Sequence, residues 1–342
     1  MTTTGTPITG IKLEKIRTLR PRRESPFAGR SEQIASQFAQ TYGMYPRNFA
    51  AFNTMSRFAY PESVSVERLA AASITHNIFF FIDDVFFDRV LPAADYGISD
   101  ETLLAPEPFL RELMGCFLSG QAPAGASRIH QGLADIGRRL GTFMSQRWLS
   151  LMVGAVSDYL SAAGERREVE YRGAGTDFLN MRDLDTGGLQ TCMLLEVTND
   201  CELPDHARND PVLAQMTWLT YRSAAWVNDI ISYHKDVILE GSVFNLVYVL
   251  MKGGRSFEEA VQEAIRLVND QIQIFLDLET QLPSWDAETD AIVDRYVSGL
   301  KDLMSGNTYW HLTSPRYQHP ESPFTELRNG WTASSQVADS AF

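Results

Sequence analysis

The chain has 342 residues, enough for one large domain or two ordinary ones, and 44% of them are hydrophobic while 21% are charged. This balance is typical of a globular protein with a sizeable core. The net charge of −13 argues against a nucleic-acid partner, because phosphate backbones are bound by clustered Lys and Arg side chains.

Cysteine usage and apolar segments bear on the cellular setting. Cys116, Cys192 and Cys201 are odd in number and show no C-x-x-C spacing, so neither a disulfide framework nor a zinc site is indicated. The first residues lack the apolar stretch of a signal peptide. The longest apolar runs, 78–82 and 246–251, are far shorter than the ~18 residues of a membrane span. We therefore expect a cytoplasmic protein without a membrane span.

In chain order, a segment rich in Thr, Pro and Arg comes first, and a polar one with Pro and Ser comes last. We predict flexible ends at residues 1–28 and 319–342 and one helical domain at 29–318. Apolar residues recur at three- and four-residue spacing, the period of a helix. This pattern covers residues 31–44, 65–88, 127–164, 210–238, 257–282 and 288–306. Strand signals are weak, so the fold class is all-α. Such helices either surround a cavity or pack as a solid bundle.

Helix start signals accompany this periodicity. Ser63, Asp210, Ser256 and Ser284 stand where N-cap residues are expected. Glu259 follows Ser256 at the spacing of a capping box.

The first group of chemically suggestive residues is Asp83, Asp84 and Asp88. On a helix Asp84 and Asp88 lie one turn apart on the same face, with Asp83 beside them. The phenylalanines at 79–81 create an apolar setting in which unpaired carboxylates are costly. A cation such as Mg²⁺ would make the cluster tolerable. The alternative is a helix end that reaches solvent, with Asp84 and Asp88 simply exposed.

The second group is Asn228, Ser232 and Asp236, which form a ladder of oxygen-bearing side chains along one helix face. Amide, hydroxyl and carboxylate oxygens together suit a second cation site. Lys235 could reach a diphosphate oxygen from this position. The alternative is an exposed polar stripe, but Trp226 and its apolar neighbours make this helix largely hydrophobic.

Two further groups are less specific on their own. At residues 182–188 a helical stretch stops at two glycines, which frees backbone groups near Arg182 and Asp185. An Arg fork suits phosphate oxygens, although an Arg–Asp pair at an ordinary helix end explains the same residues. Arg316 and Tyr317 form a basic-aromatic pair near the end of the helical region.

Together these four groups resemble the motifs of microbial class I terpene synthases, in order and spacing, across about residues 40–317. The family's aspartate-rich motif is similar to residues 83–88, and its second motif, N-D-x-x-S-x-x-x-E, to residues 228–236. The family's diphosphate-sensing Arg precedes the Asn of that motif by 46 residues, which is the position of Arg182. Its closing Arg-Tyr pair is similar to residues 316–317. Two departures are visible: Asp88 stands one place later than in the commoner D-D-x-x-D form, and Asp236 replaces Glu.

The resemblance implies an all-α, single-domain bundle around a central active-site cavity and a set of site residues. Three Mg²⁺ ions would be held by Asp83, Asp84, Asp88, Asn228, Ser232 and Asp236, although a structural salt bridge is an equal reading of Asp88. The diphosphate would be held by Arg182, Lys235, Arg316 and Tyr317. Asp185 would couple Arg182 to a helix break, with an effector carbonyl near Thr186 or Gly187.

The resemblance also implies a reaction. The enzyme would ionise an isoprenyl diphosphate, of the farnesyl or geranylgeranyl type, and cyclise the carbocation to a sesquiterpene or diterpene. Family members are often homodimers. Aromatic faces can stabilise the carbocation, and the candidates are Phe79, Phe80, Phe81, Phe178, Trp226 and, with most support from the family, Trp310. The alternatives are a chain-elongating isoprenyl diphosphate synthase, which carries aspartate-rich motifs on both helices, and a non-catalytic helical binding protein.

Overall fold

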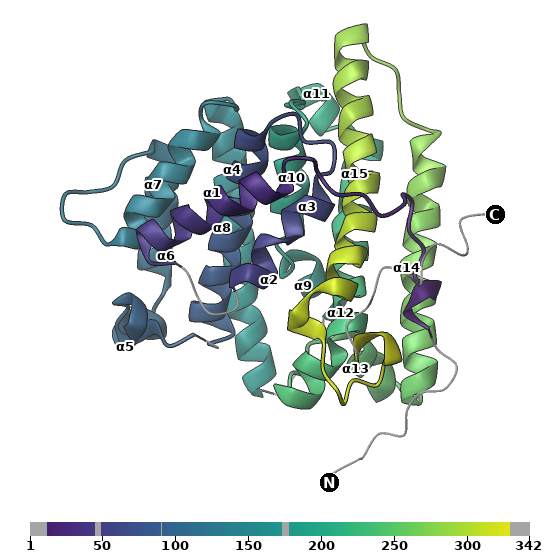
Figure 1. The fold of residues 1–342 in the computed structure, drawn as a ribbon. Helices are drawn as coiled ribbons and strands as arrows, with labels where there is room; N and C mark the ends of the chain where they lie inside the picture. The colour runs from purple at the N-terminus through teal and green to yellow at the C-terminus, as the bar shows by residue number, and fades with distance from the viewer. Residues whose placement is uncertain (1–11, 45–48, 90, 173–177, 329–342) are drawn as a thin grey trace.

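A computed structural model describes residues 12–44, 49–89, 91–172 and 178–328, and every regular element within these ranges is helical (Figure 1). The α-helices are α1 (Ala28–Tyr42), α2 (Phe49–Asn53), α3 (Met55–Ala59), α4 (Val66–Ile82), α5 (Asp100–Leu104), α6 (Glu107–Ser119), α7 (Arg128–Leu140), α8 (Gln146–Arg172), α9 (Phe178–Leu184), α10 (Gly188–Thr198), α11 (Asp205–Arg208), α12 (Pro211–Tyr233), α13 (Leu246–Lys252), α14 (Phe257–Glu279) and α15 (Ala287–Thr313). Two π-helices are η2 (Asp83–Phe87) and η4 (His234–Leu239), and the 3₁₀ turns are η1 (Leu13–Lys15), η3 (Ala93–Tyr96), η5 (Pro315–Tyr317) and η6 (Thr325–Leu327). The all-α prediction is confirmed.

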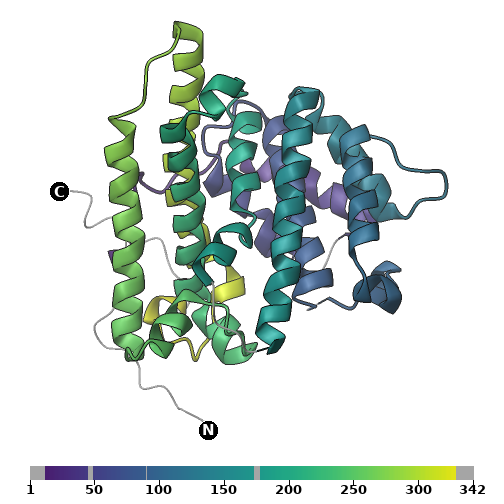
Figure 2. The ribbon, with the colours of Figure 1, turned by 180° about the vertical axis from the view of Figure 1, so that it is seen from behind.

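The long helices α8, α12, α14 and α15 and the shorter α10 run roughly side by side, with α6 and α7 on one flank of the molecule and α14 on the other (Figures 1 and 2). The predicted helical segments all appear, with one division. Residues 127–164 contain two helices, because Ser145 begins α8 by accepting a hydrogen bond from the backbone N–H of Trp148 at 3.1 Å.

Two of the four predicted N-caps are confirmed. The Asp210 side chain accepts from the first turn of α12, and Ser256 forms the predicted capping box with Glu259 at the start of α14. The other two lie two residues too early, because Ser65 caps α4 and Asp286 caps α15. The predicted Ser63 and Ser284 bond elsewhere: Ser63 donates to the backbone carbonyl of residue 65, and Ser284 donates to a carboxylate at residue 290.

The helix that carries the first aspartate cluster is the most apolar of the described part of the chain. The stretch Val66–Phe87 is long and apolar enough to pass a composition test for a membrane span, with a mean hydropathy of 1.3. However, 83% of the most apolar 18-residue part of this stretch is buried inside the fold. Its apolarity is therefore accounted for by its place in the core.

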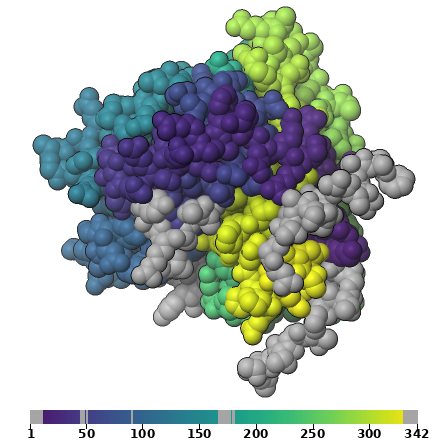
Figure 3. All heavy atoms as spheres, in the orientation of Figure 1, coloured from purple at the N-terminus to yellow at the C-terminus, as the bar shows by residue number. Residues whose placement is uncertain are grey.

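The two ends of the described chain pack together on the same face (Figure 3). The backbone N–H of Leu13 donates to the Glu326 carboxylate at 3.0 Å, and Leu13 and Leu327 are buried. Residues 17–20 bond to side chains of α14 and α15. The packed domain therefore extends beyond the predicted limits of 29 and 318. The remaining parts of the predicted flexible ends, 1–11 and 329–342, lie outside the described residues.

Close helix contact fixes α15 against the N-terminal half of the fold. A Cβ atom added at Gly306 would overlap the backbone carbonyl of Phe58 in α3. Because no side chain separates the two backbones there, α15 is held close to α3. This contact brings the end of α15, with Trp310 and His311, toward the aspartate cluster at the end of α4.

Candidate active site

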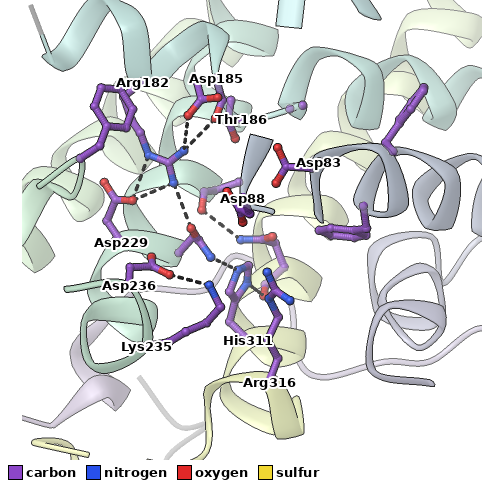
Figure 4. Close-up of a pocket in the computed structure, with 18 of the residues that line it drawn as sticks. Asp83, Asp88, Arg182, Asp185, Thr186, Asp229, Lys235, Asp236, His311 and Arg316 are labelled. Atoms are coloured by element: carbon purple, nitrogen blue, oxygen red, sulfur yellow. Dashed lines mark hydrogen bonds and ion pairs between the residues drawn. The ribbon is translucent and has the colours of Figure 1, made fainter. Parts of the chain in front are cut away.

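A cavity of about 410 Å³ lies among α4, α8, α9, α10, α12 and α15 (Figure 4), so the helices surround a cavity, one of the two arrangements left open by the sequence. One part of its wall is apolar and aromatic: Met55, Phe79, Phe80, Phe87, Tyr159, Tyr221, Phe244, Leu303 and Trp310. The other part carries charge: Asp83, Asp88, Arg182, Asp185, Asp229, Lys235, Asp236, Glu240 and Arg316. Glu240 and Gly241 are exposed, so the charged end opens to solvent.

The aspartates 83, 84 and 88 form one cluster, in which one oxygen from each lies within 4.8 Å of the others. The reason is a change of helix type. The chain passes from α-helix to π-helix at Asp83, and the backbone N–H of Asp88 bonds to the carbonyl of Asp83, five residues back, at 2.9 Å. This motif has one residue more than the D-D-x-x-D form, and the wider π-turn accommodates that extra residue. The exposed-helix-end reading fails, because Asp84 is 1% exposed and the other two are half-buried.

Neighbouring side chains hold this cluster from two sides. The Tyr159 hydroxyl of α8 donates to Asp83 at 2.9 Å. A guanidinium nitrogen of Arg316 lies 3.6 Å from an Asp84 oxygen. The central carbon of the same guanidinium, Cζ, lies 4.9 Å from the centre of the Phe52 ring. Burial opposes the charge of Arg316, but Tyr317 and the surrounding carboxylates, which include Asp84 and Asp88, outweigh it and raise the pKa of Arg316.

The second group, Asn228, Ser232 and Asp236, lies on consecutive turns where α12 passes into the π-helix η4. The Ser232 hydroxyl donates to Asp236, and the Lys235 ammonium lies 2.9 Å from the other Asp236 oxygen. Burial raises the pKa of the Asp236 carboxyl. Lys235 and the Ser232 hydroxyl lower it by a larger amount, so the net shift is downward. Ser232 is buried and Asp236 is half-buried, so the exposed-stripe reading is not supported.

Arg182 reaches across to this group from the end of α9. Its guanidinium donates to Asp229 and to Asn228 Oδ1, each at 2.9 Å, and to the backbone carbonyl of Asp185 at 2.9 Å. The residue Arg182 is 8% exposed. Arg182 is therefore buried and connects the helix break to α12. An Arg–Asp pair at an ordinary helix end does not account for these additional contacts with Asn228 and Asp229.

The helix break lies at the two glycines, as predicted. Gly187 caps α10 with a φ of +61°, which favours glycine. A Cβ at Gly188 would overlap the Tyr221 side chain of α12, so glycine also allows the two helices to approach. Asp185, Thr186 and Gly187 all line the cavity.

The end of α15 supplies a residue that the sequence pattern did not identify, His311. The His311 ring stacks on Tyr317 with centroids 4.9 Å apart, and the Tyr317 hydroxyl accepts a hydrogen bond from the Asn228 amide at 3.1 Å. Burial lowers the pKa of His311 to about 4. A second histidine of the cavity wall, His76 of α4, has a pKa lowered by burial to about 3. No local motif in the sequence marks either histidine, because their partners come from distant segments.

Three of the six aromatic candidates line the cavity, namely Phe79, Phe80 and Trp310. The other three do not. Phe81 packs edge-on against Tyr96, with centroids 4.7 Å apart. Trp226 packs under the Arg222 guanidinium, and Phe178 packs behind Phe244, which itself lines the cavity.

The charge balance of the cavity determines what it can bind. Among the described residues that line it, six carboxylates face three basic side chains. Such a surface repels an anion, yet its carboxylate, amide and hydroxyl oxygens match the ligands of hard divalent cations. The site therefore suits an anionic ligand that arrives together with metal ions, with an apolar tail in the aromatic part.

Comparisons with known proteins agree with this geometry. A family model described as terpene synthase family 2, C-terminal metal binding, matches residues 75–273. The chain is 27% identical over 276 residues to 10-epi-cubebol synthase of Sorangium cellulosum, covering 80% of this chain and 85% of that protein. It is 26% identical over 304 residues to a (+)-T-muurolol synthase of Roseiflexus castenholzii, described as (2E,6E)-farnesyl diphosphate cyclizing, covering 86% and 90%. A linalool/nerolidol synthase from Streptomyces clavuligerus, solved with 2-fluorogeranyl diphosphate, shares the fold at a TM-score of 0.75, with 24% identity and coverage of 88% and 99%.

Proposed function

The chain belongs to the terpene synthase family, whose model covers more than half of it, and on this premise we propose that it converts farnesyl diphosphate to a cyclic sesquiterpene. The reaction class follows from the family and its named relatives: the chain is a class I terpene cyclase, a lyase that acts on a prenyl diphosphate and uses a divalent metal. The observation that carries the substrate proposal is the cavity, in which an aromatic wall adjoins two clusters of oxygen ligands. The farnesyl chain length is supported by the relative named for farnesyl diphosphate cyclisation.

We propose that the metal is Mg²⁺ and that three ions bind. A phosphate monoester carries about two negative charges, so a prenyl diphosphate carries about three. The described cavity residues together with Asp84 add an excess of four carboxylates over basic side chains. Three divalent cations, the number that the resemblance implies, offset nearly all of this negative charge, whereas a single ion leaves most of the repulsion in place. Asp83, Asp84 and Asp88 would hold ions on one side, and Asn228, Ser232 and Asp236 on the other.

When bound, the metal ions supply positive charge that stabilises diphosphate as a leaving group. Arg182, Lys235, Arg316 and Tyr317 would bind and orient the diphosphate from the protein side. Burial opposes the charge of Lys235, but Asp236 and Glu240 outweigh it and raise its pKa, so this side chain stays cationic for that purpose. The helix break at 185–187 would direct backbone dipoles toward the carbon that loses the diphosphate.

The apolar part of the cavity would then control the cation. Its aromatic wall excludes water, which would otherwise quench the reaction, and presents ring faces to positive charge. Phe79, Phe80 and Trp310 would act in this way, together with Phe87 and Phe244, which line the same wall.

A chain-elongating prenyltransferase is not favoured. Such enzymes carry aspartate-rich motifs on both helices, whereas the second motif here is Asn, Ser and Asp at 228, 232 and 236. The named relatives are also synthases that form terpene products.

We further propose that the enzyme works in the cytoplasm, which is supported by its three buried, free cysteines. We also propose that it is a homodimer, as family members often are. Light scattering of the purified protein tests the assembly.

The test of the proposed function is product analysis by mass spectrometry. The protein is incubated with Mg²⁺ and geranyl, farnesyl or geranylgeranyl diphosphate, each alone and in pairs. We expect a C15 hydrocarbon or alcohol from farnesyl diphosphate alone. A C20 product formed in preference would correct the substrate, and a longer prenyl diphosphate from a pair would overturn cyclisation. No turnover of any substrate would favour a binding protein.

A further inference from the structure

The side-chain amide of Asn228 is held at both of its ends. Its Oδ1 accepts a hydrogen bond from Arg182 at 2.9 Å. Its Nδ2 donates to His311 Nε2 at 3.0 Å and to the Tyr317 hydroxyl at 3.1 Å. Because a guanidinium only donates, the end that faces Arg182 must be the oxygen. The nitrogen end therefore faces His311 and Tyr317.

The backbone of α15 determines which His311 nitrogen carries the proton. Nδ1 lies 2.7 Å from the carbonyl of Asn307, one turn earlier in the same helix, and a carbonyl only accepts. The proton is thus on Nδ1, and Nε2 presents a lone pair to Asn228. The ring has little freedom to turn, since it is 4% exposed, stacks on Tyr317 and packs edge-on against Trp310 with centroids 4.8 Å apart.

The three partners of the amide differ in what they can enforce. Arg182 would be drawn toward the diphosphate, so its contact with Asn228 can be lost when substrate binds. The Tyr317 hydroxyl both donates and accepts, so it tolerates either orientation of the amide. His311 accepts only, and a reversed amide would place its oxygen against the Nε2 lone pair. Among these partners, His311 alone discriminates between the two orientations after Arg182 has moved.

We propose that His311 is a positioning residue for the metal site: it keeps the Asn228 amide oriented with its oxygen toward the cation. This inference rests on the proposed role of Asn228 as a metal ligand. Only the oxygen of an amide binds a hard cation, so a reversed amide would present N–H groups to the ion. The partners of metal ligands set ligand orientation in this way, and losing one costs roughly 10- to 100-fold in metal affinity.

The test compares His311→Phe with His311→Gln. Phenylalanine keeps the flat ring against Tyr317 but removes the acceptor, whereas the glutamine amide oxygen can accept from Asn228. The readout is the Mg²⁺ concentration that gives half of the thermal stabilisation produced by inorganic diphosphate, measured without turnover. We expect His311→Phe to raise that concentration about tenfold or more and His311→Gln to raise it much less. Equal, small shifts in both variants would overturn the proposal. His311→Leu serves as the acceptor-free variant where phenylalanine does not fold.

A second comparison separates orientation from general structural damage. In Asn228→Asp both ends of the side chain are oxygens, so orientation no longer matters. We expect His311→Phe to cost nothing in that background, or to tighten Mg²⁺ binding by removing a lone pair that faces the carboxylate. An equal loss in both backgrounds would mean that His311 is only structural. If Asn228→Ala leaves the Mg²⁺ dependence unchanged, the ligand assignment itself fails; if Asn228→Ala abolishes it while His311→Phe does not, only the present inference fails.

Discussion

At the scale of single residues, Asp83 tests the metal assignment most directly. It lines the cavity and accepts a hydrogen bond from Tyr159 at 2.9 Å. In Asp83→Asn the amide oxygen can keep that hydrogen bond, but the negative charge that attracts a cation is lost. We expect kcat/KM to fall by about 100-fold or more, with an unchanged unfolding temperature.

The matched control for this substitution is Asp270→Asn. Asp270 is exposed on α14, where it pairs with Arg266, and such surface pairs contribute little to stability. Activity and unfolding temperature should both stay near those of the unmodified enzyme. An Asp83→Asn variant that matches this control in steady-state kinetics would remove Asp83 from the metal site.

His76 makes a prediction about pH and stability. It is 4% exposed, between Ser56 and Tyr60, and burial lowers its pKa from 6.5 to about 3. The folded state therefore holds this ring neutral, while the unfolded chain takes up a proton below pH 6.5. The contribution of His76 to stability is complete above that pH and is lost progressively as the pH falls toward 3.

The size of this effect follows from the linkage relation. Between about pH 7.5 and about pH 5.5, one such histidine lowers the free energy of unfolding by about 1.4 kcal/mol. Glutamine does not titrate, so His76→Gln should show a loss smaller by that amount over the same interval. Urea unfolding of both proteins at the two pH values measures the difference. Parallel losses in the two proteins would show that His76 is not held neutral in the fold.

At the scale of the helices, the two π-turns are the elements that form the site. Each occurs where a long core helix reaches the cavity, and each places a charged residue five positions after another on the same face: Asp88 after Asp83, and Glu240 after Lys235. A π-turn is equivalent to one residue inserted into an α-helix, and such insertions are frequent at functional sites. In the first motif the insertion brings Asp88 under Asp83, whereas these two residues would stand about 140° apart around a regular α-helix.

This view predicts the effect of deleting one residue. Removal of Val85 converts the first motif to Asp-Asp-Phe-Phe-Asp, the spacing that an ordinary α-helix accommodates. We expect the variant to fold, to keep a carboxylate cluster and to retain Mg²⁺-dependent turnover within about tenfold. Circular dichroism, thermal unfolding and product assays provide the measurements.

The control is removal of Ala72, another fully buried aliphatic residue, which lies in the regular part of α4. That deletion rotates every later side chain of α4 by about 100°, out of its packing position in the core. It should prevent folding or lower the unfolding temperature steeply. If the two deletions are equally damaging, the extra residue of η2 is a required part of the core.

At the scale of the whole molecule, the sequence predicts what is local and misses what depends on distant segments. The helical periods, the capping box at Ser256 and the helix break at Gly187 are set by near neighbours, and the structure contains all three. The aspartate cluster was predicted on an α-helical period, which cannot describe a π-turn. The contact of His311 with Asn228 joins residues 83 positions apart, so no local pattern reveals it.

The aromatic candidates illustrate the same limit. A run of phenylalanines at 79–81 covers most of a helix circumference, so composition alone cannot choose the residues that face the cavity. Tertiary packing decides the matter: Phe79 and Phe80 line the cavity, where Phe80 lies against Trp310 of α15 with ring centroids 5.9 Å apart, and Phe81 packs on Tyr96.

The charge of the whole site leads to a last prediction, that diphosphate and Mg²⁺ bind only together. The cavity has twice as many carboxylates as basic side chains among its described lining residues, and the protein as a whole carries a charge of −13. Inorganic diphosphate alone should therefore be repelled and should not raise the unfolding temperature. With Mg²⁺ at saturating concentration, binding at about 100 times the dissociation constant adds about 2.7 kcal/mol, which corresponds to a rise of roughly 4 °C. Chelation of the metal should reverse the rise, and sodium chloride of equal ionic strength should not replace Mg²⁺. A full rise with diphosphate in the presence of a chelator would show that Arg182, Lys235 and Arg316 suffice to bind it and that the carboxylates have another purpose.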